Sequence, residues 1–418
     1  MSRHRRIPAS GINLFQLIYI LIREYEEKTG KKALNLSLGN PDLLPFSEVR
    51  ELKARFAGLE RYELHTYAED NNVNQFAEGM VRALTGVEVA EHAHMKAVPI
   101  AGIKTATALL PLACGMHLKD RKQFHVVTNL PAYDVMGTWT TSYLASNRIV
   151  WPLSSTEGMA LRMDRLEEAL KKAQVERPDL IFVIRPGNPA SAGASREDWK
   201  KLIEFCIERG TRLVNDGAYT ALGREGGHVP LSQVAKDYPE LEWAELLSVS
   251  KCFSDPGARL GVMVGSKEFV EDYILIKGNT DSGPNPHVMA AYGELFKDTA
   301  LARDLLKRLT DIYLARLGYL VPKLKALGLQ PACETTAGFF TLWKTPETAW
   351  GYNLAEESQK RGMSRSELFN RLTIDQAGVV GVHFQGPPET GESFIRYAVC
   401  TDVLSPDFQR NFEASMKP

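Results

Sequence analysis

The sequence predicts an α/β protein, in which a large domain holds a mostly parallel β-sheet flanked by helices and a smaller α+β domain lies beside it. Three observations lead to this prediction. Short apolar segments alternate with helical segments through the middle of the chain, as expected where helices connect parallel strands. From residue 297 onward the pattern changes to long charged helices followed by separate strands. The length of 418 residues favours two or three domains over one.

The spacing of apolar residues predicts the individual elements in order. Residues 14–28 carry apolar side chains at helical spacing, and a helix over 195–209 starts at Ser195, has Asp198 three positions later and stops at Gly210. Further helices are predicted at 104–116, 164–174 and 297–326. Strands are predicted at 98–100, 124–128, 148–151, 180–184, 212–215 and 246–249, with those of the second domain near 338–344 and 393–400.

These elements suggest a division of the chain. We expect an N-terminal arm and part of the small domain at residues 1–49, the large domain at 50–296 and the small C-terminal domain at 297–418.

Composition and charge exclude several classes of function. Fifty Lys plus Arg against 51 Asp plus Glu leave a net charge of −1, which favours neither nucleic acid nor an anionic membrane as partner. No apolar run approaches the roughly 20 residues of a membrane span. The five cysteines are scattered and His92 and His94 lack further ligands nearby, so no disulfide framework and no metal site are expected. A reduced, cytoplasmic protein is the expectation.

The most informative segment is Ser248-Val-Ser-Lys-Cys-Phe-Ser-Asp-Pro-Gly-Ala-Arg259. Lys251 directly follows an apolar strand, where burial lowers the pKa of an amine and frees it as a nucleophile. Ser248, Ser250 and Arg259 are groups suited to a phosphate monoester. A lysine that forms a Schiff base beside a phosphate site explains the pattern; an ordinary surface loop is the alternative.

This segment resembles the lysine signature of the class I/II aminotransferases, the aspartate aminotransferase-like enzymes of fold type I that use pyridoxal 5′-phosphate (PLP). The resemblance implies a seven-stranded sheet in the large domain. It also implies that Lys251 carries PLP as an aldimine and that Ser248, Ser250 and Arg259 bind its phosphate.

A second segment, Asn215-Asp-Gly-Ala-Tyr219, ends another apolar strand. A buried carboxylate needs a partner, which a pyridinium N–H provides, although an Asp at a strand end also serves as a helix cap. The resemblance implies that Asp216 keeps the PLP nitrogen protonated and that Tyr219 bonds to the phenolic oxygen of PLP.

Three further motifs follow strands. In Arg185-Pro-Gly-Asn-Pro189 the resemblance implies that Asn188 contacts the phenolic oxygen and lies near the substrate carboxylate. Tyr133 would stack on the pyridine ring, with a core tyrosine as the alternative. Backbone N–H groups at a helix start form an anion site, and the resemblance assigns Gly102, Ile103 and Lys104 to the phosphate.

The substrate side of the site rests on weaker signals. Arg396 lies in an apolar strand and needs an anionic partner, so it matches the family's arginine for the α-carboxylate, with a structural ion pair as the alternative. Gly39 resembles the loop that closes over substrate. Tyr67 resembles the tyrosine donated to the neighbouring subunit, which implies a homodimer with shared sites. His383 either faces the substrate or caps a strand.

The resemblance implies an aminotransferase that moves an amino group between an α-amino acid and a 2-oxo acid by a ping-pong mechanism. A β-lyase or decarboxylase of the same fold is the runner-up, and a non-catalytic PLP-binding protein is a third hypothesis. The sequence does not identify the amino donor: where dicarboxylate-specific relatives carry a second arginine, this chain has Gly278 beside Lys277. A basic contact from Lys277, an aromatic pocket using Tyr19 or Tyr67, and an open pocket are the alternatives.

Overall fold

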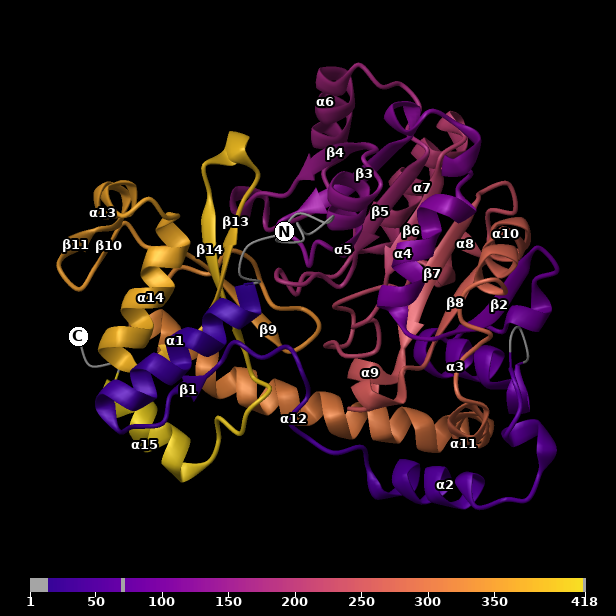
Figure 1. The fold of residues 1–418 in the computed structure, drawn as a ribbon, viewed down its shortest axis with the longest axis horizontal. Coiled ribbons are helices and arrows are strands. Elements are labelled where there is room, and N and C mark those ends of the chain that lie inside the picture. Colours follow the sequence, from indigo (N-terminus) through magenta and orange to yellow (C-terminus); the bar gives the residue numbers. More distant parts are fainter. Residues whose placement is uncertain (1–13, 69–71, 416–418) are drawn as a thin grey trace, which may run out of the picture.

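The computed structural model describes residues 14–68 and 72–415, which include every predicted site residue (Figure 1). Residues 1–13, the first part of the predicted N-terminal segment 1–49, lie outside the described residues. Within them, no helix is both long and apolar enough to cross a membrane.

A seven-stranded sheet forms the centre of the molecule and confirms the predicted fold class. Its order is β2-β8-β7-β6-β5-β3-β4, and β8 runs antiparallel to both neighbours while the other pairs are parallel. The strands are β2 (Met95–Ile100), β3 (His125–Leu130), β4 (Asn147–Pro152), β5 (Leu180–Ile184), β6 (Arg212–Asp216), β7 (Trp243–Ser248) and β8 (Gly261–Ser266).

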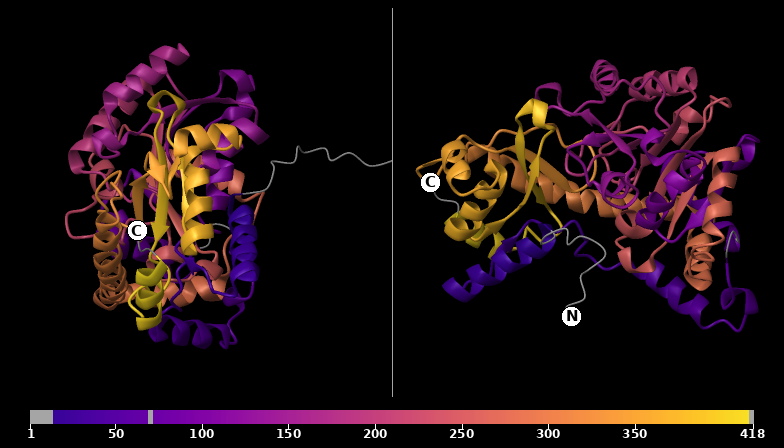
Figure 2. Two further views of the ribbon diagram at one scale, coloured as in Figure 1. Left: turned by 90° about the vertical axis from the view of Figure 1, so that its left-hand side faces the viewer. Right: turned by 45° about the horizontal axis from the view of Figure 1, so that its top comes forward.

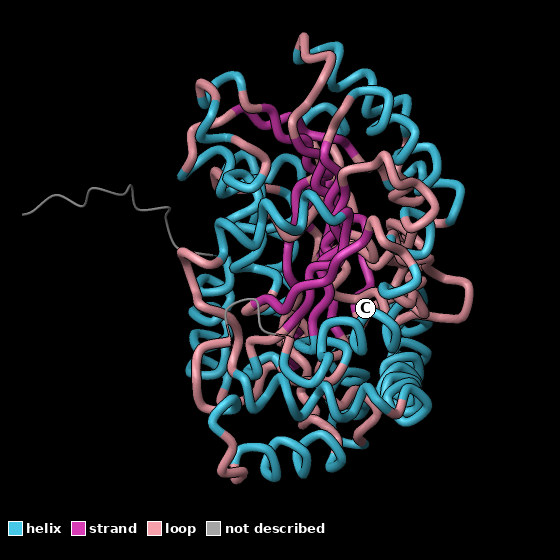
Figure 3. The backbone as a smooth tube through the Cα atoms, turned by 90° about the vertical axis from the view of Figure 1, so that its right-hand side faces the viewer, coloured by secondary structure: helices cyan, strands magenta, loops and turns pink. Residues whose placement is uncertain are grey.

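Helices cover both faces of this sheet (Figure 3). Side chains alternate between the faces as strand geometry requires: in β5, Leu180, Phe182 and Ile184 join one apolar cluster and Ile181 and Val183 the other. The first cluster includes residues of α4 (Ile103–Ala113) and α10 (Lys267–Lys277). The second includes residues of α3 (Phe76–Thr85), α6 (Met163–Ala173), α7 (Arg196–Arg209) and α11 (Pro286–Lys297).

Helix α7 begins and ends where the sequence predicts. The Ser195 hydroxyl accepts a hydrogen bond from the Asp198 amide at 3.1 Å, and the Asp198 carboxylate accepts one from the Ser195 amide at 2.8 Å. Gly210, with φ of 59°, ends the helix in the left-handed region. This capping box stabilises the helix by about 1 kcal/mol.

A second, three-stranded antiparallel sheet lies toward the C-terminus in the order β13-β14-β9. Its strands are β9 (Phe340–Lys344), β13 (Val382–Gln385) and β14 (Ser393–Ala398). The 28-residue helix α12 (Thr299–Ala326) extends from the large sheet to this one (Figure 1). Smaller pairs are β1 (Leu34–Asn35) with β12 (Val379–Val380), and β10 (Thr348–Ala349) with β11 (Tyr352–Asn353).

The N-terminal segment lies against this C-terminal part (Figure 2). Helix α1 (Leu14–Thr29) packs Ile18 and Tyr25 against Ile374 of α14 (Arg365–Ala377), and β1 pairs with β12. The exact domain boundaries stay a prediction.

The remaining α-helices are α2 (Ser47–Ala57), α5 (Val135–Thr138), α8 (Ser232–Ala235), α9 (Val249–Cys252), α13 (Leu354–Lys360) and α15 (Pro406–Ser415).

Candidate active site

A cavity of about 490 Å³ opens where β5, β6 and β7 end, between the large sheet and β14. Twelve of the fourteen predicted site residues line it: Gly39, Ile103, Lys104, Tyr133, Asn188, Asp216, Tyr219, Ser248, Ser250, Lys251, Arg259 and Arg396. The large sheet, β14 and the loop of Gly39 therefore bring together residues that lie more than 300 positions apart in the sequence.

Lys251 lies in the short helix α9, directly after β7. Its Nζ donates to the Gly39 carbonyl at 2.6 Å and lies 3.4 Å from Asn40 Oδ1. Burial, together with the nearby cations Arg396 and Lys104, lowers the pKa of Lys251 to about 8. A substantial fraction of the amine is therefore neutral near pH 8 and able to attack a carbonyl.

Asp216 ends β6 beneath the same cavity. Burial raises the pKa of its carboxyl group to about 6, although a hydrogen bond from the Ala218 amide at 3.1 Å favours the ionised form. No ion pair involves Asp216 among the described residues, so the carboxylate suits a protonated ring nitrogen. Tyr219 is buried edge-on against Phe339 and Phe340, with ring centroids 5.4 and 5.5 Å away, and burial raises its pKa.

Two hydroxyls, a guanidinium and a helix start form an anion site at one end of the cavity. Ser248 Oγ donates to Ser250 Oγ at 2.8 Å, and both side chains line the cavity with Arg259. Gly102 precedes α4 with φ of 88°, and a Cβ there would lie 2.5 Å from Arg259 Nη2. Only glycine lets the guanidinium approach the first turn of the helix, and both features attract a phosphate.

Arg396 and Asn188 also line the cavity and contact each other. Arg396 is 1% exposed; its Nη1 donates to Asn188 Oδ1 at 2.7 Å and its Nη2 to the Ser37 carbonyl at 2.6 Å. The guanidinium lies 4.1 Å from the centroid of Phe340. Burial lowers the pKa of Arg396 to about 10. No carboxylate among the described residues pairs with it, so a structural ion pair does not account for this arginine, and its planar fork suits a carboxylate that enters the cavity.

Two predicted site residues, Gly102 and Tyr67, do not line the cavity. Neither do His383 and Lys277, for which the sequence left a role at the substrate open. Gly102 lies directly before the lining residue Ile103, whereas Tyr67 is 80% exposed on the surface. His383 lies in β13 opposite Ile395 and is not among the lining residues. Lys277 is 1% exposed and its Nζ lies 3.3 Å from Asp281 Oδ1, away from the cavity.

The sequence did not single out all the lining residues. Asn40 contacts Lys251 and was within reach of prediction, since it follows Gly39 in the same motif. Tyr19, which the sequence left open as part of an aromatic donor pocket, also lines the cavity. The others are mostly apolar and carry no sequence signal of their own: Leu38, Thr107, Val135, Phe182, Ile184, Ala218 and Pro256.

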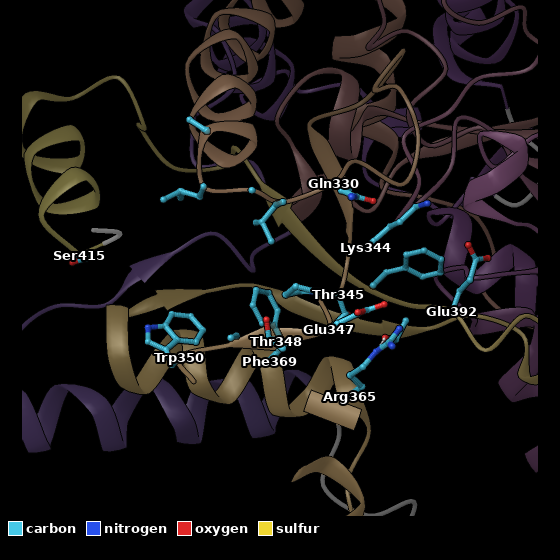
Figure 4. A pocket seen from close by; sticks show the side chains of 18 residues that line it. Gln330, Lys344, Thr345, Glu347, Thr348, Trp350, Arg365, Phe369, Glu392 and Ser415 are labelled. Carbon is cyan, nitrogen blue, oxygen red and sulfur yellow. Dashed lines mark hydrogen bonds between the residues drawn. The ribbon is translucent and has the colours of Figure 1, made fainter. Parts of the chain in front are cut away.

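A larger cavity of about 980 Å³ lies elsewhere, between the end of α12, β9, β10 and α14 (Figure 4). Lys344, Arg365, Glu347 and Glu392 line one part of it, and Trp350 and Phe369 another. None of the predicted site residues contributes to it. Nor do the described residues contain a group of three or more His, Cys, Asp or Glu that could hold a metal ion.

A half-buried lysine with a lowered pKa, a carboxylate without an ionic partner and a group of side chains suited to a phosphate lie in one cavity, which fits an enzyme that uses PLP. The comparisons agree: a family model described as aminotransferase class I and II matches residues 31–404. The chain belongs to the class I/II aminotransferases, whose cofactor is PLP.

Curated relatives and solved structures support the same family and fold. The chain is 28% identical to an LL-diaminopimelate aminotransferase of Syntrophobacter fumaroxidans over 93% of this chain and 92% of that protein. It is 26% identical to one of Aquifex aeolicus, with 91% and 90% covered. A Thermus thermophilus aspartate aminotransferase double mutant shares the fold at a TM-score of 0.76, with 18% identity and 100% and 98% covered.

Proposed function

We propose that this aminotransferase takes an α-amino acid with a second charged group as its donor, and that LL-diaminopimelate is the first donor to test. The relatives named for that substrate match over most of their length, at 24–28% identity. The observation that carries the proposal is a cation in the cavity without an anionic partner among the described residues. Lys104 lines the cavity, and its Nζ lies 5.5 Å from the Tyr133 ring centroid. Lys104 forms no ion pair within the described part of the chain.

The assignment of roles follows the chemistry of each side chain. PLP, when bound, supplies an electron-withdrawing ring that stabilises negative charge at the substrate Cα. Ser248, Ser250 and Arg259 hold its phosphate, and Asp216 keeps its ring nitrogen protonated. With its lowered pKa, the Lys251 amine would serve as the general base for the proton at the substrate Cα and, once protonated, as a general acid in the same site.

The remaining residues hold cofactor and substrate in place. Asn188 and Tyr219 hydrogen-bond the phenolic oxygen of PLP, and Tyr133 packs on its ring. Arg396 binds the α-carboxylate with its planar fork, which fixes the Cα–H bond relative to Lys251. Lys104 remains for a distal carboxylate of the donor.

A homodimer is part of the proposal. Five large apolar side chains are 70–82% exposed, which packing within a single subunit does not explain: Leu44, Tyr62, Tyr67, Leu118 and Leu275. In the dimer Tyr67 of each subunit reaches the phosphate site of the other. Sedimentation equilibrium of the holoenzyme tests this, and a monomer would contradict it. A reducing, cytoplasmic location fits the five free cysteines.

The decisive experiment is the visible absorption spectrum of the PLP-loaded protein during titration with single amino acids. Conversion by LL-diaminopimelate to the pyridoxamine form, reversed by a 2-oxo acid, supports the proposal, as do parallel double-reciprocal plots. Conversion only by other amino acids would overturn the donor assignment. Accumulation of pyruvate or carbon dioxide without conversion would indicate the lyase or decarboxylase alternative. Lys251→Ala is the control and is expected to lose the Schiff-base band.

A further inference from the structure

A second buried arginine lies outside the chemistry described so far. Arg185 directly follows β5 and is 0% exposed. Its Nη1 donates to the Ala192 carbonyl at 3.2 Å and its Nη2 to the Met159 carbonyl at 2.5 Å, and its Nε has no partner. None of the ion pairs found in the described residues involves it. Keeping a guanidinium buried against two carbonyls alone is unfavourable, so a role beyond packing is expected.

The side chain of Arg185 closes the loop that carries Asn188. The Ala192 carbonyl accepts hydrogen bonds from both Arg185 Nη1 and the Gly187 amide, the latter at 3.1 Å. Within this loop the Ser191 amide donates to the Gly187 carbonyl at 2.8 Å. The side chain of Arg185, at the start of the loop, is thus bonded to Ala192 at the end of the loop, and Asn188 lies between these two residues in the sequence.

The backbone of Arg185 is held from below by a buried polar pair. Asn215 Oδ1 accepts from the Arg185 amide at 2.9 Å, and Asn215 Nδ2 donates to the Arg185 carbonyl at 2.8 Å. The same Nδ2 donates to Glu245 Oε1 at 3.0 Å. Glu245, 0% exposed, also accepts from the amides of Leu231 at 3.1 Å and Ser232 at 3.0 Å. The start of the loop is therefore fixed to the sheet.

Asn188, between these two fixed ends, makes two contacts in the cavity. Its carbonyl accepts from the Tyr133 amide at 2.7 Å, and its Oδ1 accepts from Arg396 Nη1 at 2.7 Å. The Arg396 guanidinium is oriented by two acceptors, Asn188 Oδ1 and the Ser37 carbonyl. A shift of the loop therefore moves one of these acceptors, and it also moves the carbonyl that binds the Tyr133 amide.

We propose that Arg185 is a positioning residue for this reaction: its guanidinium sets the place of Asn188 and, through it, the direction of the Arg396 fork toward the substrate. This inference rests on the proposed function, because it needs Arg396 to bind the α-carboxylate and Asn188 to contact the cofactor. Only arginine reaches both carbonyls with one planar group, so lysine replaces it incompletely.

The test uses the PLP-loaded enzyme and the best amino donor from the absorption titration. Methionine keeps the volume of Arg185 without the charge. Arg185→Met is expected to raise KM about tenfold while kcat changes by less than about threefold, since the loss concerns substrate binding. Arg185→Lys is expected to give an intermediate KM. In the Asn188→Ala background, Arg185→Met should raise KM no further, because the effect passes through Asn188.

Two readouts without turnover separate positioning from stability. The pH midpoint of the visible absorption band should shift in Arg185→Met, because Asn188 faces the phenolic oxygen, and hydrogen exchange in residues 186–194 should accelerate. Arg212→Met is the control. Arg212 also donates to a carbonyl, that of Ala113, and pairs with Glu242 and Asp272, but it begins β6, whereas Asp216 ends that strand at the cavity. It should lower the unfolding temperature without moving KM or the absorption midpoint.

The inference would be overturned if Arg185→Met left KM, the pH midpoint of the absorption band and the hydrogen exchange of residues 186–194 unchanged. It would also be overturned if the increase in KM caused by Arg185→Met added fully to that caused by Asn188→Ala. If Arg185→Met does not fold, the same comparisons with Arg185→Lys decide. An enzyme that transaminates no donor would refute the proposed function instead, and the absorption midpoint and the exchange rates would still test Arg185.

Discussion

Replacing Lys251 with methionine is expected to stabilise the protein without PLP at neutral pH, although it abolishes activity. Burial lowers the pKa of Lys251 from the ordinary 10.5 to about 8. The difference of about 2.5 units, at 1.36 kcal/mol per unit, corresponds to about 3 kcal/mol by which the protonated lysine destabilises the fold. Methionine removes the buried charge and its destabilising effect, and it retains an unbranched side chain of similar length.

The sign of the pH dependence follows from proton binding. Between pH 8 and 10.5 the unfolded chain binds a proton at Lys251 more readily than the folded chain. Between pH 8 and 10.5 the free energy of unfolding of the wild type therefore rises with pH relative to that of Lys251→Met. The advantage of Lys251→Met is full below about pH 8 and has vanished by about pH 10.5, apart from a difference that does not vary with pH.

Urea unfolding of both apoproteins, followed by tryptophan fluorescence at intervals from pH 7 to pH 10, measures this difference. Lys323 provides a control of opposite sign, because its hydrogen bond to Glu413 raises its pKa. Lys323→Met should give no gain at neutral pH. A difference between wild type and Lys251→Met that is constant across the pH range would refute the reasoning, as would a more stable wild type at pH 7.

Three further variants address the cavity. Asp216→Asn should retain the Schiff-base absorption band but lower kcat by more than about a hundredfold, measured by single-turnover kinetics, because the ring nitrogen loses its anionic partner. Arg396→Lys should raise KM at least about tenfold with all donors, since lysine lacks the planar fork for the α-carboxylate. Lys104→Met should reduce kcat/KM for a donor with a second carboxylate about tenfold relative to an uncharged donor; an equal effect on both would remove Lys104 from donor selection.

The fold class was readable from the sequence because a buried parallel sheet leaves a strong local pattern. Strand β5 occupies the predicted 180–184, and its side chains are buried on both faces. Strand β8 was not predicted. Glycines at positions 261 and 265 lower its strand propensity, and it follows the lysine motif directly. Their hydrogens lie against the backbone of β7, where a Cβ would come within 2.3 Å of a carbonyl oxygen.

The site was predicted as far as local motifs reach. The motifs of Asn188, Asp216 and Lys251 each follow one of the neighbouring parallel strands β5, β6 and β7, whose carboxyl ends meet, so separate signals converged on one cavity. Contacts formed across the sheet gave no such signal. Asn215 and Arg185 are 30 residues apart, and only the pairing of β5 with β6 makes them neighbours. Lys277 ends α10, and its Nζ lies 3.3 Å from Asp281 Oδ1 in the turn that follows the helix.

The register of the central strands accounts for both the reaction geometry and the buried polar pair. Ile184 pairs with Asp216, and Asp216 pairs with Leu246, so the loop of Asn188, the carboxylate of Asp216 and the strand before Lys251 meet at one level of the sheet. Asn215 and Glu245 form the next row down and also pair directly. A slip of one residue would turn these side chains to the opposite faces. The polar row opposes such a slip, because Asn215 and Glu245 would lose partners that nothing else in the apolar sheet replaces.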